Sequence, residues 1–147
     1  MPKAAKVRYR ITAVLFLLFA AGHTAGFLTF HPKATNALAV QEAMQRVQFA
    51  AGGTIVSWNN FYTGFGLFVS VYLLFSAFLA WRLSEANATE ANMARTVAWM
   101  LFAVQLANIA LCLRYFGPVQ VSFSIACAAI VGWAALQTVK SEVSVRA

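Results

Sequence analysis

The residue of this chain whose type and place could do chemistry is His23. It lies in the apolar run of residues 11–30, and Gly22 and Gly26 flank it four residues apart. An ionisable side chain at bilayer depth is costly and is a candidate functional site by default. Two interpretations of His23 stay open: a group that serves a ligand or a reaction, and a polar clamp between helices.

Few other polar side chains lie at a comparable depth in the apolar runs. Counting about 1.5 Å per residue from the middle of each run puts Ser70, Asn108 and either Ser124 or Cys127 near the level of His23, with Gln105 about one turn away. Each such group needs a hydrogen-bond partner in hydrocarbon. We therefore predict one polar layer inside a helical bundle that binds a ligand or holds the helices together, made of His23, Thr24, Ser70, Gln105, Asn108 and Ser124.

His23 is expected to point into this bundle as a neutral imidazole, because burial disfavours its charged form and no carboxylate lies in any apolar run. The runs hold too few ligands for a metal site, which usually takes three or four His, Cys or carboxylate groups. They offer only His23, Cys112 and Cys127. No cofactor can be assigned. His23 and His31 cannot both ligate one haem from opposite faces, since they are expected eight residues apart on one helix. No catalytic residue is therefore predicted, although an enzyme that uses His23 as acid, base or haem ligand stays open.

These residues must be positioned by long apolar helices. Sixty-one per cent of the chain is hydrophobic and only 10% is charged, against about 25% charged residues in soluble domains. A transmembrane helix needs about 20 apolar residues. Four runs qualify, with Arg114 as their one charged residue: residues 11–30, 61–81, 96–115 and 119–139. We predict an all-α integral membrane protein, with residues 1–147 as one four-transmembrane-helix domain.

Glycines and one short turn indicate how the helices pack. Small residues let neighbouring helices approach closely, and we assign this role to Gly22, Gly26, Gly64, Gly66 and Gly132. The link at residues 116–118 is Phe-Gly-Pro. A link this short forces the third and fourth spans into an antiparallel hairpin.

A short amphipathic helix is predicted over residues 36–50, between the first and second spans. Thr35 or Asn36 can cap it, and Gly52-Gly53 can end it. Apolar residues recur at helical spacing on one face, namely Val40, Ala43, Met44, Val47 and Ala50. The helix either rests on the bilayer as a connector or covers the mouth of the bundle as a lid.

The basic residues predict the orientation. The net charge is +7, but the basic residues are scattered at the ends of the runs, so we predict no nucleic-acid partner. Eight fall on the side of the termini: Lys3, Lys6, Arg8, Arg10, Arg82, Arg95, Lys140 and Arg146. Three fall on the other side: Lys33, Arg46 and Arg114. The excess marks the cytoplasmic side, so both termini are expected there. The first run also resembles a signal peptide, but an even span count needs it, so we expect it to be retained.

Two motifs carry a resemblance to a known family. The first span holds Gly22-His23-Thr24-Ala25-Gly26, and the second opens with Phe61-Tyr62-Thr63-Gly64-Phe65-Gly66. Together with Met44, Phe49 and Gly53, this pattern resembles a family of small uncharacterised four-span bacterial inner-membrane proteins, distantly similar in architecture to DoxX-type proteins. The likeness covers the chain to about Leu83. It implies a multi-pass protein of the bacterial inner membrane and implies no activity.

Three functions fit these observations. The first is binding of a small apolar or amphipathic ligand, such as a lipid or quinone, in the bundle, with the polar layer orienting one end of it. The second is a non-enzymatic interaction subunit that self-associates, as a homo-oligomer, or packs on a partner. The third is the His23 enzyme. The bilayer itself is the one partner common to all three.

Overall fold

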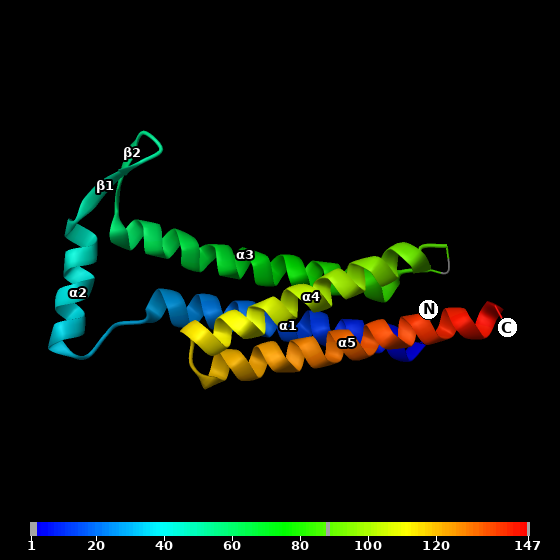
Figure 1. Cartoon of the computed structure of the whole chain (residues 1–147). Coiled ribbons are helices and arrows are strands. Elements are labelled where there is room, and N and C mark those ends of the chain that lie inside the picture. Colours follow the sequence, from blue (N-terminus) through cyan, green and yellow to red (C-terminus); the bar gives the residue numbers. More distant parts are fainter. Residues whose placement is uncertain (1–2, 88, 147) are drawn as a thin grey trace. The chain divides into compact units, whose positions relative to one another are not determined.

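The computed structural model describes residues 3–87 and 89–146, with side chains described as far as Thr138. Four helices in it are long and apolar enough to cross a membrane, which confirms the predicted all-α class and makes the chain a multi-pass membrane protein. The described elements follow in chain order (Figure 1): α1 (Lys3–Thr29), α2 (Thr35–Arg46), β1 (Gln48–Ala51), β2 (Thr54–Ser57), α3 (Trp58–Glu85), α4 (Ala91–Tyr115) and α5 (Pro118–Arg146).

The long helices extend beyond the apolar runs. α1 begins at Lys3 rather than at residue 11, and α3 runs from Trp58 to Glu85 rather than over residues 61–81. Lysine and arginine are good helix formers and can keep their charged ends in water while their stems lie on apolar surface. Hydropathy therefore marks where the membrane begins and not where the helix begins.

The chain forms two compact units. Unit 1 contains α1 as far as Phe19, α3 from Leu73 onward, and all of α4 and α5. Its buried side chains are largely small, which lets helix backbones approach closely. Alanines contributed by all four helices form much of this core: Ala5, Ala13, Ala77, Ala80, Ala94, Ala98, Ala128, Ala134 and Ala135.

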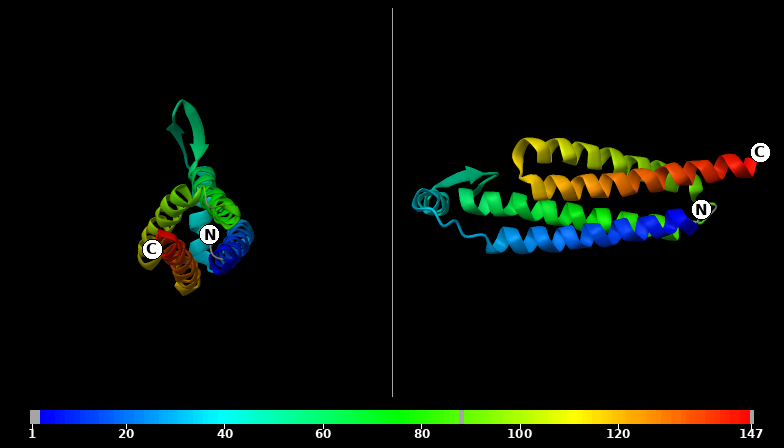
Figure 2. Two further views of the ribbon diagram at one scale, coloured as in Figure 1. Left: turned by 90° about the vertical axis from the view of Figure 1, so that its right-hand side faces the viewer. Right: turned by 90° about the horizontal axis from the view of Figure 1, so that it is seen from below.

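α4 and α5 pack against each other as an antiparallel hairpin (Figure 2), as the short turn predicts. The Phe116 amide caps α4 by donating to the Cys112 carbonyl, 3.0 Å away. Pro118 then opens α5, where its missing N–H leaves no hydrogen bond unmade. A Cβ built on Gly132 would lie 2.7 Å from the Phe102 ring, so this glycine allows the ring of α4 to contact the backbone of α5.

Unit 2 contains residues 20–72: the end of α1, then α2, the two strands and the start of α3. Here the predicted helix over residues 36–50 is wrong at its end, because α2 stops at Arg46 and β1 follows. Its N-cap is Ala34, not Thr35 or Asn36. The predicted helix terminator, Gly52-Gly53, instead turns an antiparallel hairpin, with φ of 57° and 85°. Tight hairpin turns need such positive φ values, which glycine supplies without strain.

Aromatic packing explains why residues 48–51 leave the helix. The Phe49 ring lies 4.4 Å from the Trp58 ring and 5.5 Å from the Phe61 ring, between ring centroids. An extended backbone carries Phe49 back to the start of α3 to make these contacts. α2 itself runs across the end of α1 and the start of α3 (Figures 1 and 2) and has no buried residue.

Candidate functional site

His23 forms a polar contact between α1 and α3. Its Nε2 lies 3.0 Å from the carbonyl oxygen of Gly66. A carbonyl can only accept, so Nε2 carries the proton and donates it. The imidazole is half-buried and stacks on the Phe27 ring at 5.8 Å between centroids. The described partner is thus a backbone group, which residue types alone could not single out.

Thr24, the next residue, forms a second hydrogen bond between α1 and α3. The Thr24 and Ser70 hydroxyl oxygens are 2.7 Å apart and hydrogen-bonded. The Thr24 hydroxyl is also 2.7 Å from the Ala20 carbonyl one turn earlier in α1. Adjacent residues of α1 therefore contact groups four residues apart on α3, and the structure brings His23, Thr24 and Ser70 together as a clamp within unit 2.

Gly66 is the glycine that makes this clamp close. A Cβ built there would lie 2.1 Å from the Phe27 ring, so any side chain would displace it. At Gly22, Gly26 and Gly64, by contrast, an added Cβ would meet no described atom within 4 Å. Of the five glycines assigned to helix packing, Gly66 and Gly132 thus have a ring directly against the backbone.

The remaining polar residues lie in unit 1. The Asn108 amide Nδ2 donates to the Ser124 hydroxyl at 2.9 Å and so joins α4 to α5. The Cys112 thiol lies 3.5 Å from the same hydroxyl. Gln105 is buried on α4, and Cys112 and Cys127 are both buried free thiols.

These polar contacts join neighbouring helices. His23 donates a hydrogen bond to a backbone carbonyl. Among the side chains that the structure describes, residues 3–87 and 89–138, no group of three or more His, Cys, Asp and Glu could hold a metal ion.

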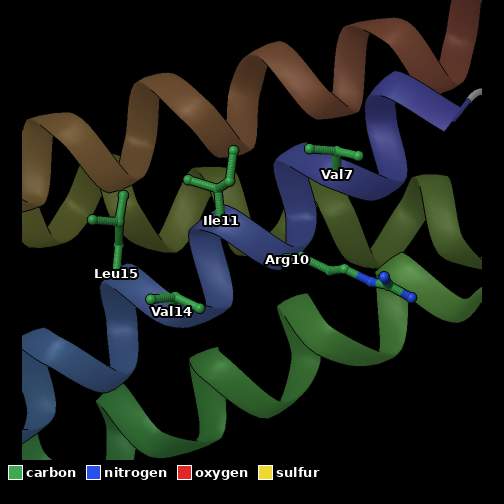
Figure 3. Close-up of a pocket in the computed structure, with 5 residues that line it drawn as sticks. All are labelled: Val7, Arg10, Ile11, Val14 and Leu15. Atoms are coloured by element: carbon green, nitrogen blue, oxygen red, sulfur yellow. The ribbon is translucent and has the colours of Figure 1, made fainter.

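A hollow in the described surface lies elsewhere, on the first half of α1 in unit 1. It is an open groove of about 440 Å³ lined by Val7, Arg10, Ile11, Val14 and Leu15 (Figure 3). Four of these residues are aliphatic, and Arg10 is the only one with a charge. Such a surface can hold an apolar chain with a polar group at one end.

Arg10 extends from the groove toward α3 (Figure 3), where its guanidinium carbon lies 5.7 Å from the centre of the Trp81 ring. This distance is within the range of a cation–π contact. The Trp81 indole N–H donates to Glu85 at 3.0 Å, and Arg82 donates to the other oxygen of Glu85 at 2.8 Å. The ring under Arg10 is therefore held in place, and the Glu85 charge is paired with Arg82.

The groove was missed from the sequence because the first span was counted from residue 11. A signal was present, however. Val7, Arg10, Ile11 and Val14 recur at three- and four-residue spacing, which places them on one face of a helix that begins earlier.

Comparisons of this chain with protein-family models, with curated proteins and with solved structures find no match. Its class is therefore defined by its own elements: an all-α multi-pass membrane protein with four apolar helices.

Proposed function

We propose that this protein is a non-enzymatic membrane protein that binds a small apolar or amphipathic molecule of the bilayer, such as a lipid or quinone. The observation that carries the proposal is the α1 groove of about 440 Å³, aliphatic along its length and charged only at Arg10. Sites for small molecules commonly enclose about 300–1,000 Å³. The lining thus combines one cation with an aliphatic surface, and a bilayer molecule with one polar group and an apolar chain has complementary chemistry.

In this proposal the polar residues are structural. His23, Thr24 and Ser70 join α1 to α3, and Asn108 with Ser124 joins α4 to α5. The proposed ligand site is thus a groove on α1, and not the polar layer that we predicted from the sequence. We place the protein in a bacterial inner membrane with both termini cytoplasmic, on the support of the eight-to-three distribution of basic residues and of the family resemblance.

The test is mass spectrometry of organic extracts from the purified protein and three variants. Val14→Trp fills the groove, Leu18→Trp adds the same ring at another exposed position of α1, and His23→Ala breaks the clamp. We expect a molecule to be retained by the wild type, Leu18→Trp and His23→Ala, and to be lost from Val14→Trp. Equal retention by all four, or no retained molecule, would refute the proposal. If the molecule is lost from His23→Ala alone, the ligand site is the polar layer around His23 and not the groove.

One observation favours a second candidate function, self-association. Gly22 and Gly26 are four residues apart on α1, both are exposed, and an added Cβ at either would meet no described atom within 4 Å. Glycines at this spacing form close helix dimers in membranes. A particle mass that is dimeric for the wild type and monomeric for Gly26→Leu would support this candidate.

A further inference from the structure

We infer that the α1 groove takes an anionic phospholipid, with its phosphate at the Arg10 guanidinium and an acyl chain along Ile11 and Val14. The inference rests on the proposed function, because it names the chemical class of the molecule in the same groove. It commits to a lipid of the leaflet on the side where α1 begins.

The order of residues along α1 matches a phospholipid from head to tail. Lys3 and Lys6 precede Arg10, and Val7 is the one aliphatic groove residue on that side of it. The other three, Ile11, Val14 and Leu15, lie beyond Arg10. Lysine or arginine residues clustered beside a membrane attract anionic lipids. Charge thus gathers at the end of the helix where headgroups lie, and aliphatic surface follows toward the bilayer centre.

Trp81 places Arg10 at headgroup depth. Tryptophan is enriched where the apolar core of a bilayer meets its headgroups. Trp81 is 45% exposed, and its ring lies beneath the Arg10 guanidinium. Arg10 also immediately precedes the uncharged run of α1. The cation is therefore at the level of a lipid phosphate and not in the hydrocarbon.

The contact with Trp81 leaves Arg10 able to bind a phosphate. At 5.7 Å from the ring centre the guanidinium is attracted to the ring by its charge. This attraction needs no hydrogen bond, so the N–H donors of Arg10 can serve an anion. These donors match the oxygens of a phosphate and can bind two of them at once. The neighbouring carboxylate, Glu85, accepts hydrogen bonds from Trp81 and Arg82, so its charge is already offset.

Arg8 provides a contrast two residues away. Its guanidinium lies 3.9 Å from the centre of the Trp133 ring and donates to the Gln137 side chain, both on α5. Arg8 is half-buried and serves packing inside unit 1, whereas Arg10 is exposed at the edge of the groove. The two arginines therefore have different roles, which total charge near the terminus would not separate.

The test is native mass spectrometry of the delipidated full-length protein with phosphatidylglycerol and with phosphatidylcholine of identical acyl chains. We expect the wild type to prefer phosphatidylglycerol. Arg10→Gln should lower phosphatidylglycerol binding roughly fivefold, the effect of one cation at a membrane surface, and leave phosphatidylcholine binding unchanged. Arg114→Gln is the matched control. It removes an exposed arginine that also lies over an aromatic ring, that of Tyr115. Arg114 lies beside the turn between α4 and α5 and does not line the groove, so this variant should change neither.

The outcomes separate the inference from the proposed function. If the wild type binds both lipids equally, and Val14→Trp abolishes both, the inference fails while the groove remains a lipid site. The inference also fails if Arg10→Gln has no effect or if Arg114→Gln has the same effect. If the wild type binds neither lipid and retains no molecule from the cell, both are wrong.

Discussion

Gly66 has two functions in the clamp between α1 and α3. Its carbonyl oxygen accepts the His23 hydrogen bond, and its missing side chain leaves room for the Phe27 ring. Phe27 also stacks on His23 and lies 5.3 Å from the Tyr62 ring, between centroids. The hydrogen bond and the ring packing therefore depend on the same short stretch of α3, and a change at Gly66 disturbs both.

Gly66→Ala should lower the melting temperature of the detergent-solubilised protein. The new Cβ would lie 2.1 Å from the Phe27 ring, and overpacking of this kind costs about 1–3 kcal/mol. Gly64→Ala is the control. It adds the same methyl group where no described atom lies within 4 Å, and it should leave stability unchanged or raise it by up to about 1 kcal/mol through helix propensity.

A third variant isolates the contact. On a Phe27→Leu background the ring is absent, so Gly66→Ala should cost less than it does in the wild type. Equal losses for Gly66→Ala and Gly64→Ala, or an unchanged cost on the Phe27→Leu background, would contradict the role of Gly66.

Among the elements, the α4–α5 hairpin could be predicted best. The Phe-Gly-Pro turn allows only an antiparallel return, and the structure has it. The region after α2 could be predicted least, because Gly-Gly ends helices and turns hairpins equally well. What decides between them is the contact of Phe49 with Trp58 and Phe61, a tertiary contact that periodicity within the segment does not contain.

The hairpin predicts a disulfide within one chain. Asn108→Cys combined with Ser124→Cys should crosslink on mild oxidation, because the side-chain atoms of these residues are 2.9 Å apart. The native thiols are removed by Cys112→Ser and Cys127→Ser. The measurement is the shift in gel mobility on reduction. A crosslink that forms only between two chains would show that α4 and α5 pair in trans.

On the scale of the whole molecule, contacts in unit 1 join the early part of α1 to the late part of α5. Arg8 contacts Gln137, and the Tyr9 hydroxyl lies 3.4 Å from the Thr138 hydroxyl. The start of α1 and the late part of α5 are thus at the same end of this unit. That agrees with four crossings, which return the chain to the side where it began.

Reporter fusions test which side this is. We expect a periplasmic signal for a fusion at residue 45, and cytoplasmic signals in the link between α3 and α4 and at residue 147. Eight of the eleven basic residues lie on the side of this link and the termini, and such an excess marks the cytoplasmic side. A cytoplasmic signal at residue 45 or a periplasmic one at residue 147 would contradict the predicted orientation.

How far the sequence predicts the candidate site depends on the kind of partner. Thr24 with Ser70, and Asn108 with Ser124, are side-chain pairs that depth counting could suggest. The rotation of each helix about its axis decides which side chains come into contact, and the hydropathy of an apolar run does not indicate this rotation. For the same reason the Gly66 carbonyl could not be foreseen as the His23 partner, nor the Trp81 ring as the Arg10 partner.

The short link between α4 and α5 also bears on how the chain enters its membrane during synthesis. Only Phe116 and Gly117 separate the two helices, and Arg114 is the one charged residue near this turn. If the two helices insert as a pair, almost no charged or polar side chain of the turn has to cross the bilayer. The loop between α1 and α3 is different. With the proposed cytoplasmic termini, Lys33, α2 with Glu42 and Arg46, and the β1–β2 hairpin would all cross the bilayer. Dependence on the cell's insertion machinery should therefore concentrate in the first half of the chain.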